Sequence, residues 1–373
     1  MKLSNINASK KNILCVVGTR PEAIKMAPVI IALKKEPWAR VRVLATAQHR
    51  QMLDQVLDFF GVKPDIDLNI VRPNQALTEL TGRLLLELDV VLKEEKPDVV
   101  LVQGDTTTVM TVALACFYHG ISIGHVEAGL RTWDIRNPFP EEANRIIAGK
   151  LARWHFAPTE ESRKNLLRDG IADNDIIVTG NTVIDALLET AEKKLEMGLP
   201  VDPEKRVVLV TSHRRENFGE PFRSICRALK ILARRNPEVQ FLFPVHPNPN
   251  VKDIAYEFLS QEPNFLLCEP LDYAPFIAAM KRAILILTDS GGVQEEAPAL
   301  GKPVLVLREE TERPEAVAEG VVELVGSDSE HIVQRVQCLL DDETEYKKMA
   351  RGVSPYGDGK AAQRIVAVLR EQA

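Results

Sequence analysis

The chain has 373 residues, 45% of them hydrophobic and 27% charged, a composition typical of globular proteins that bury a full core. The length favours two domains of about 150–200 residues each. The formal net charge of −6 argues against a basic field for nucleic acid or an anionic membrane.

The cysteines and the N-terminus indicate the compartment. Five cysteines, an odd number, lie in apolar segments, which predicts free thiols rather than a disulfide framework. The first twelve residues are polar, and the apolar run after them is too short for a signal peptide. No stretch approaches the roughly 18 apolar residues of a membrane span. We therefore expect a cytoplasmic protein.

The first half of the chain alternates short apolar runs with stretches of helical spacing. Strands are predicted at residues 12–17, 41–46, 98–102, 121–126, 154–157 and 175–179, and helices at about 21–35, 48–60, 77–95 and 107–118. This alternation predicts βαβ units and a parallel sheet. In such sheets the ligand crevice lies at the carboxyl ends of the strands.

Charged residues follow several of these strands. Arg20 follows the first strand, Asp105 follows the strand at 98–102, and Glu127 follows the strand at 121–126. Glu141 and Glu142 open a later helix. Carboxylates gathered at one edge can transfer protons when their pKa values differ. Two structural alternatives stay open: Asp105 as a helix cap, and the glutamates as partners of a helix dipole.

The second half repeats the pattern. Strands are predicted at 207–211, 239–243, 265–268, 284–287 and 303–307, which indicates a second doubly wound domain. We predict an N-terminal Rossmann-like domain at 1–180 plus 356–373, carrying the catalytic carboxylates, and a C-terminal one at 181–355. The last helix, 360–370, returns to the first domain.

The stretch from Thr288 to Pro303 is predicted to form a strand, a tight turn and a helix. Gly291 and Gly292 let a ligand approach the backbone, and the helix start suits a phosphate. Glu296 offers a carboxylate to two ribose hydroxyls. Alternatively, the polar residues only cap the helix.

Two further residues point to the same chemistry, and other ligand classes lack support. His213 follows the first strand of the second domain and is a candidate for phosphate binding or proton transfer. Arg313 follows the strand after the glycine turn. The chain has no Gly-x-Gly-x-x-Gly after a strand, no P-loop and no convincing metal-ligand spacing.

A series of motifs runs through the whole chain in order: Gly18–Pro28 (GTRPEAIKMAP), Thr46–Arg50 (TAQHR), Gly104–Thr108 (GDTTT), Gly124–Arg131 (GHVEAGLR), Pro140–Arg145 (PEEANR), Thr288–Ala297 (TDSGGVQEEA), Thr311–Glu315 (TERPE) and Pro355–Gly359 (PYGDG). Together they resemble the non-hydrolysing UDP-N-acetylglucosamine 2-epimerases of bacteria. The resemblance implies two Rossmann-like domains facing a cleft, of glycosyltransferase-B type. It also implies interconversion of UDP-GlcNAc and UDP-ManNAc without a cofactor.

The resemblance assigns roles to individual residues. Asp105, Glu127, Glu141 and His213 match catalytic positions of the family. The positions that match UDP contacts are Arg20, Lys25, Leu271, Phe276, Ser290, Gly291, Gly292, Glu296 and Arg313. The family route eliminates UDP to form 2-acetamidoglucal and adds UDP again, with a proton delivered to the opposite face of C2.

Regulation and assembly are also implied by the resemblance alone. Gln48, His49 and Gln51 match part of a second, allosteric UDP-GlcNAc site, whereas residues 71–74 depart from the family pattern. A homodimer supplying a polysaccharide pathway is expected. The alternatives are a hydrolysing epimerase, an epimerase of a modified UDP-sugar, a glycosyltransferase and a non-enzymatic UDP-sugar sensor.

Overall fold

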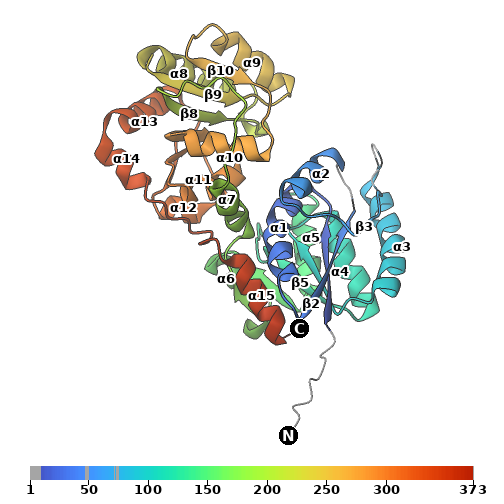
Figure 1. The fold of residues 1–373 in the computed structure, drawn as a ribbon. Helices are drawn as coiled ribbons and strands as arrows, with labels where there is room; N and C mark the ends of the chain where they lie inside the picture. The colour runs from blue at the N-terminus through green and yellow to red at the C-terminus, as the bar shows by residue number, and fades with distance from the viewer. Residues whose placement is uncertain (1–9, 47–49, 71, 73–74, 373) are drawn as a thin grey trace. The chain divides into compact units, whose positions relative to one another are not determined.

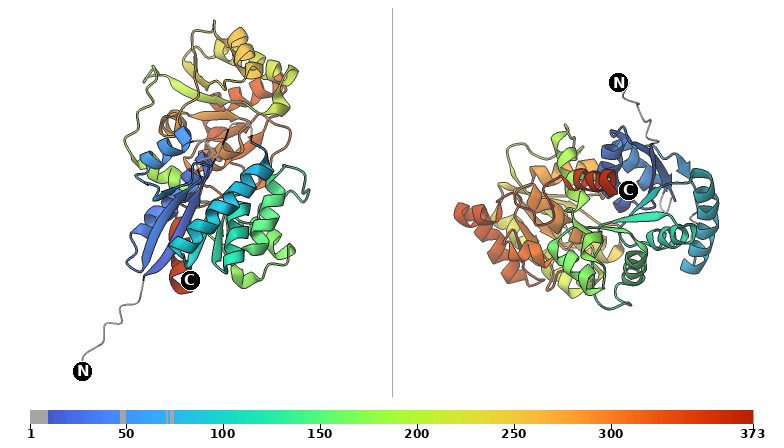
Figure 2. Two further views of the ribbon diagram at one scale, coloured as in Figure 1. Left: turned by 90° about the vertical axis from the view of Figure 1, so that its right-hand side faces the viewer. Right: turned by 90° about the horizontal axis from the view of Figure 1, so that it is seen from below.

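The computed structural model describes residues 10–46, 50–70, 72 and 75–372, and it forms two compact units (Figures 1 and 2). Unit 1 comprises Met1–Ala186 and Tyr356–Ala373, and unit 2 comprises Leu187–Pro355. The sequence places the first boundary after residue 180, and the structure places it after Ala186. The difference arises because the first turn of helix α7 (Thr182–Glu192) is packed into unit 1, where Ile184 is fully buried.

Unit 1 contains a parallel seven-stranded sheet in the order β3-β2-β1-β4-β5-β6-β7. Its strands are β1 (Lys11–Val17), β2 (Ala39–Ala45), β3 (Ile66–Asp67), β4 (Val99–Gln103), β5 (Ser122–Val126), β6 (Trp154–Ala157) and β7 (Ile176–Val178). Its helices, besides the start of α7, are α1 (Arg20–Lys34), α2 (Arg50–Phe59), α3 (Leu77–Glu95), α4 (Thr107–His119), α5 (Glu141–Leu151), α6 (Glu160–Arg168) and α15 (Ala361–Gln372). The expected return of the last helix to the first domain is confirmed, because α15 packs beside α1 (Figure 1).

Unit 2 contains a parallel six-stranded sheet in the order β10-β9-β8-β11-β12-β13. Its strands are β8 (Arg206–Thr211), β9 (Val239–Pro244), β10 (Phe265–Cys268), β11 (Leu285–Thr288), β12 (Val304–Val306) and β13 (Val322–Leu324). Its helices are α8 (Glu220–Arg235), α9 (Pro249–Leu259), α10 (Tyr273–Arg282), α11 (Gly291–Ala299), α12 (Pro314–Ala318), α13 (Ser329–Asp341) and α14 (Glu343–Met349). The two-residue β3 and the edge strand β13 are not anticipated by the sequence.

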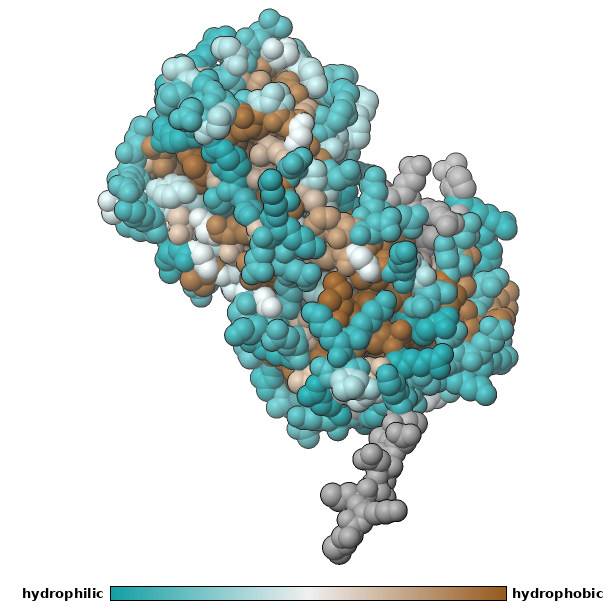
Figure 3. Space-filling model, viewed as in Figure 1, coloured by the Kyte–Doolittle hydropathy of each residue, from teal (hydrophilic) through white to brown (hydrophobic). Residues whose placement is uncertain are grey.

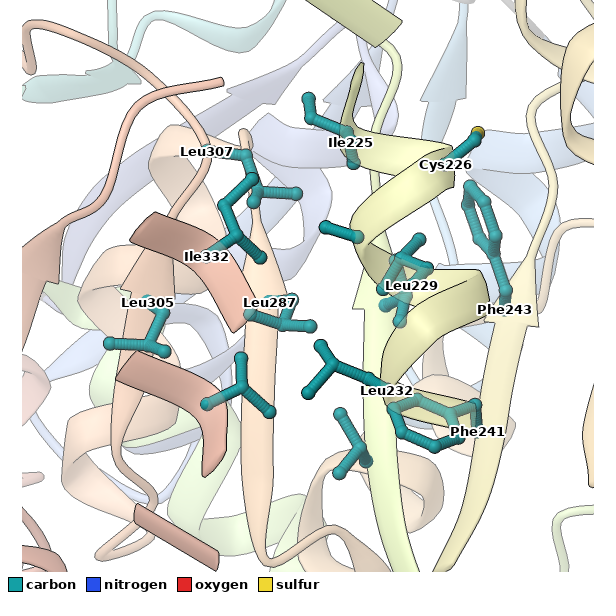
Figure 4. Close-up of a cluster of buried hydrophobic side chains, with 14 of the residues drawn as sticks. Ile225, Cys226, Leu229, Leu232, Phe241, Phe243, Leu287, Leu305, Leu307 and Ile332 are labelled. Atoms are coloured by element: carbon teal, nitrogen blue, oxygen red, sulfur yellow. The ribbon is translucent and has the colours of Figure 1, made fainter. Parts of the chain in front are cut away.

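The core of unit 2 shows how side-chain periodicity builds these layers (Figure 4). Helix α8 presents Ile225, Leu229 and Leu232 to the sheet at helical spacing. Strand β9 presents Phe241 and Phe243, two residues apart, to the same cluster. Helix α8 thus buries one face against the sheet, whereas β9 also buries Leu242 on its opposite face.

The first six strands of each unit have the order 3-2-1-4-5-6, and unit 1 adds β7 at one edge. In this order the direction in which successive strands are added reverses beside the first strand of the unit. In unit 1 this switch point lies between β1 and β4, and in unit 2 between β8 and β11. Ligands of doubly wound sheets bind at the carboxyl ends of the strands at this point. The loops after these four strands are therefore the first places to look for a site.

The visible face is mostly hydrophilic, with hydrophobic patches between polar side chains (Figure 3). All five cysteines are free, as predicted, and Cys15, Cys116 and Cys226 are buried. None of the described helices combines the length and apolar character needed to cross a membrane.

Candidate active site

The turn between β1 and α1 brings a buried carboxylate to the edge of unit 1. Glu22 completes a capping box by accepting hydrogen bonds from the N–H groups of Gly18 and Thr19. It also accepts one from Thr106 Oγ1 (2.6 Å) in the β4–α4 loop. Burial raises the pKa of Glu22 to about 7, although these hydrogen bonds lower it. A Cβ at Gly18 would lie 2.6 Å from Thr46 Oγ1, so this close approach requires glycine.

Glu127 directly follows β5 and adopts a left-handed backbone conformation, with φ of 63°. Its two carboxylate oxygens accept hydrogen bonds from Lys25 Nζ at 2.6 and 2.7 Å. Gln103 Nε2, at the end of β4, donates to Oε2, and Asn181 Nδ2 donates to Oε1 at 2.9 Å. An ammonium group and two amides favour the ionised carboxylate over the neutral acid.

Asp105, in the loop after β4, is paired with a cation from helix α5. Arg145 of α5 contacts Asp105 Oδ2 through Nε (2.9 Å) and Nη2 (2.7 Å), and Asn144 Nδ2 donates to the Asp105 backbone oxygen at 2.9 Å. The N-cap of α4 is Thr106, so the alternative that Asp105 caps this helix is wrong. Helix α5 therefore fixes the position of the Asp105 carboxylate.

The two glutamates at the start of α5 differ in their surroundings. Glu142 is fully buried and accepts hydrogen bonds from the N–H groups of Thr132 (3.1 Å) and Trp133 (3.2 Å) and from Arg145. Glu141 Oε2 is buried, and none of the described residues hydrogen-bonds to it. Because an unpaired buried oxygen is costly, Glu141 is the carboxylate suited to a ligand, while Glu142 anchors the preceding loop.

In unit 2 the loop after β8 is held by one fully buried carboxylate. Asp289, directly after β11, accepts hydrogen bonds from the N–H groups of His213 and Arg214, each at 2.9 Å at the closest. Ser212 Oγ (2.8 Å) and Asn217 Nδ2 (3.1 Å) donate to the same carboxylate. These four polar groups converge on one side chain, which joins the two loops at the switch point.

His213 lies at this edge in a partly exposed position. Its Nδ1 is 3.4 Å from Asp289 Oδ1, and its ring stacks on His246 with centroids 5.7 Å apart. Burial lowers the pKa of His213, although Asp289 raises it. The imidazole is therefore neutral at pH 7 and can donate or accept a hydrogen bond.

The start of α11 has the features of an anion site. Ser290 is the N-cap, so the first N–H groups of α11 are not paired within the helix. A Cβ on Gly291 would lie 3.6 Å from an Arg214 Nη atom, which places a guanidinium beside the helix start. Arg313 forms an ion pair with the buried Glu295 of the same helix. Two arginines and a helix N-terminus suit a diphosphate.

The other predicted residues lie at the same edges or outside the description. Arg20 is the first residue of α1; Leu271 and Phe276 lie before and within α10; Gly292 and the buried Glu296 lie in α11. Gln48 and His49 fall outside the described residues, as does the side chain of Gln51. In the described part of the chain, no group of three or more His, Cys, Asp or Glu side chains is arranged to hold a metal ion.

Sequence reasoning overlooked four residues that hold the predicted ones. These are Gln103 and Asn181 on Glu127, Arg145 on Asp105, and Asp289 beside His213. Gln103, Asn181 and Asp289 lie at or just beyond a strand's carboxyl end, which is the signal that identified Glu127. Arg145 lies within a helix, and only the tertiary structure reveals its partner.

Comparisons with known proteins agree along the whole chain. The family model described as UDP-N-acetylglucosamine 2-epimerase matches residues 31–370. The UDP-N-acetylglucosamine 2-epimerase of Escherichia coli K12 is 54% identical over 368 residues, covering 96% of this chain and 98% of that protein. The crystal structure of UDP-GlcNAc 2-epimerase from Neisseria meningitidis bound to UDP-GlcNAc has a TM-score of 0.87 and 48% identity, covering 97% and 100%.

A more distant structure bears on the fold alone. The glycotransferase of kitacinnamycin matches with a TM-score of 0.67 and 12% identity, covering 97% of this chain and 99% of its own. Two parallel-sheet α/β domains shared with both groups confirm the predicted glycosyltransferase-B type fold.

Proposed function

This chain belongs to the UDP-N-acetylglucosamine 2-epimerase family, and we propose that it interconverts UDP-GlcNAc and UDP-ManNAc by inversion at C2. The observation that carries the proposal is Glu127, whose carboxylate is held by Lys25 at the carboxyl end of β5. Asp105, in the loop after β4, and Glu141, at the start of α5, lie at the same edge of unit 1. The Neisseria relative, whose structure holds UDP-GlcNAc, supports the choice of substrate.

The chemistry of the substrate dictates an elimination. The C2 proton has no adjacent carbonyl group, so simple deprotonation would leave an unstabilised carbanion. When the bond from C1 to the diphosphate oxygen breaks, its electrons leave with UDP. The C2–H electrons form the C1=C2 bond of 2-acetamidoglucal, and the proton passes to a carboxylate. Re-addition of UDP at C1 and of a proton at the opposite face of C2 completes the inversion.

Two faces of C2 require proton carriers on both sides, and unit 1 supplies three candidates. Glu127 is suited to accept a proton because Lys25 keeps it ionised. Glu141 has a buried oxygen that a substrate group can contact. Asp105 is held by Arg145 and orients the sugar or transfers a proton. We leave the two faces unassigned between these carboxylates.

Unit 2 is proposed to bind the leaving group. Negative charge grows on the diphosphate as the C1–O bond breaks, so cations and N–H groups fixed beforehand lower the barrier. Arg214, Arg313 and the start of α11 supply such groups. They also retain UDP for the second step, which separates this reaction from release of free sugar. Glu296 is proposed to accept hydrogen bonds from the ribose, and Phe276 to lie beside the uracil.

The remaining family properties are proposals of the same kind. Allosteric control by UDP-GlcNAc, supply of ManNAc units to a surface polysaccharide and a cytoplasmic location rest on the sequence alone. A homodimer gains one physical argument, which is exposed apolar area on neighbouring helices α3 and α4. The residues are Leu86 (72% exposed), Val90 (50%), Phe117 (60%) and Tyr118 (72%). Burial of such a patch against a second copy would remove it from water.

Proton NMR of UDP-GlcNAc with the purified protein in heavy water tests the proposal. We expect UDP-ManNAc to appear with deuterium at C2 and with little free sugar. Free ManNAc and UDP would instead indicate a hydrolysing epimerase. If UDP-GlcNAc stayed unchanged even in excess, while a modified UDP-sugar exchanged its C2 proton, the substrate assignment would be wrong.

A further inference from the structure

The chain crosses between its two units twice, and the unit 1 sides of both crossings are bonded to each other. The chain leaves unit 1 after Ala186 and returns at Tyr356. Asn181 N–H donates to the Tyr356 backbone oxygen at 2.6 Å. Asp185 accepts hydrogen bonds from the N–H groups of Ala361 (3.2 Å) and Ala362 (2.9 Å) at the start of α15. These hydrogen bonds therefore join the outgoing segment and the returning segment into one structural element.

Two glycines allow the backbones of these two segments to approach each other closely. A Cβ on Gly180 would lie 3.2 Å from the Cα of Gly357, and a Cβ on Gly357 would lie 3.4 Å from Asn181 N. Both glycines also have positive φ, of 90° and 147°. A side chain at either position would strain the backbone and push the segments apart. The Asn181 backbone is thus fixed from both sides.

The side chain of Asn181 points from this element to Glu127. Asn181 is 2% exposed, and its Oδ1 accepts a hydrogen bond from Val183 N–H (3.1 Å) in the first turn of α7. This bond needs the oxygen, so the NH₂ group must face the other way. There it donates to Glu127 Oε1 at 2.9 Å. The hydrogen bonds to Val183 and to Glu127 therefore fix the direction in which the amide points.

We propose that Asn181 is a positioning residue for the reaction, which fixes Glu127 relative to the segments where the chain passes between the units. The proposal rests on the proposed role of Glu127. Lys25 and Gln103 contact Glu127 from α1 and β4, whereas Asn181 contacts it from the crossing. A carboxylate held from the crossing keeps its direction toward the C2 proton, and proton transfer depends steeply on such geometry.

The test uses three variants of the full chain. N181D is isosteric and keeps an oxygen for the Val183 cap, but it places a second carboxylate against Glu127. N181S also keeps a capping hydroxyl, which is too short to reach Glu127. The matched control is N236D, which alters another buried amide, bonded to Leu232 O (2.9 Å) and Gln337 (3.0 Å) in unit 2.

The kcat of C2 deuterium exchange, its pH profile and the KM for UDP-GlcNAc are measured for each variant. For N181D we expect kcat to fall at least 100-fold at pH 8, with partial recovery on acidification, because two adjacent carboxylates then share a proton. A new alkaline limb should therefore appear in the kcat profile, at the pH where the pair loses this shared proton. N181S should lose at least tenfold in kcat with an unchanged melting temperature. KM should stay within threefold, and N236D should keep the wild-type pH profile.

Two results would overturn the inference. One is folded N181D and N181S with wild-type kcat and pH profile; the other is a loss of kcat that only parallels a loss of thermal stability, as in N236D. The proposed function fails separately. If E127Q retained exchange, or the wild type showed none, the role of Glu127 would be wrong whatever the Asn181 variants did.

Discussion

The two units share one strand order, but their switch points carry opposite chemistry. At the edge of unit 1, the carboxylates of Glu127 and Asp105 are held by Lys25 and Arg145. At the edge of unit 2, arginines and the start of α11 surround a place for an anion, and the carboxylate Asp289 is buried beneath the loops. We propose that this shared topology supplies a proton-transfer edge in unit 1 and an anion-binding edge in unit 2. The fold provides the position, and the loop residues provide the function.

The largest expected effect separates the two edges. E127Q removes a charge from unit 1 and keeps the size of the side chain, so the proton acceptor is lost while unit 2 is untouched. We expect kcat for C2 exchange to fall at least 1000-fold, equivalent to about 4 kcal/mol of transition-state stabilisation. Isothermal titration should give a UDP affinity within threefold of the wild type.

The control for E127Q is E323Q, which alters a glutamate paired with Arg335 (2.6 Å) on β13 of unit 2. It should keep normal turnover. Near-normal exchange in E127Q would remove Glu127 from the proton-transfer step. Loss of UDP binding in E127Q would show that UDP binding is not confined to the edge of unit 2, contrary to our proposal.

A smaller effect concerns the stability of unit 1. The folded pKa of Glu22, about 7, lies above its ordinary 4.5, so between these values the folded protein binds more protons than the unfolded chain. The free energy of unfolding should therefore fall as pH rises from 4.5 to 7, by on the order of 3 kcal/mol at most. E22Q cannot ionise and should lack this decrease.

Amide hydrogen exchange locates the effect of Glu22. After correction for the intrinsic exchange rates, protection of the β1 and β4 amides should decrease as pH rises in the wild type. In E22Q this protection should stay constant. The amides of β8 and β11 should respond equally in both proteins. E79Q, at an exposed glutamate on α3, serves as the control. Parallel pH curves for wild type and E22Q would contradict the prediction.

The smallest expected effect is a loss of UDP affinity in unit 2 that leaves the carboxylates of unit 1 in place. R313A removes a cation beside α11 and leaves the buried Glu295 without its ion pair, which repels a diphosphate. We expect the Kd for UDP to rise about tenfold, or about 1.4 kcal/mol. The kcat at saturating substrate should also fall, by about fivefold, because Arg313 is proposed to stabilise the negative charge that grows on the diphosphate. R335A, which removes a surface arginine paired with Glu323, should leave Kd unchanged. An unaltered Kd in R313A would exclude Arg313 from the UDP site.

The sequence predicts most of this arrangement, for a reason specific to parallel sheets. Strand ends can be found from apolar runs, and Asp105, Glu127 and His213 follow such ends directly. Contacts between distant segments are different. Arg145 reaches Asp105 across 40 residues and Asn181 reaches Glu127 across 54, and no local pattern indicates either pairing. Strand β3 escaped prediction because its two residues carry no periodicity, and in β13 the charged Glu323 interrupts the short apolar run.

The left-handed backbone of Glu127 has an evolutionary consequence. A residue with a Cβ at φ of 63° costs about 1–2 kcal/mol, which glycine would not. Replacement of Glu127 by glycine therefore relieves this backbone strain but removes the carboxylate. Selection for a sturdier protein and selection for an active one act in opposite directions here, and libraries screened only for thermal resistance should enrich glycine or asparagine at position 127.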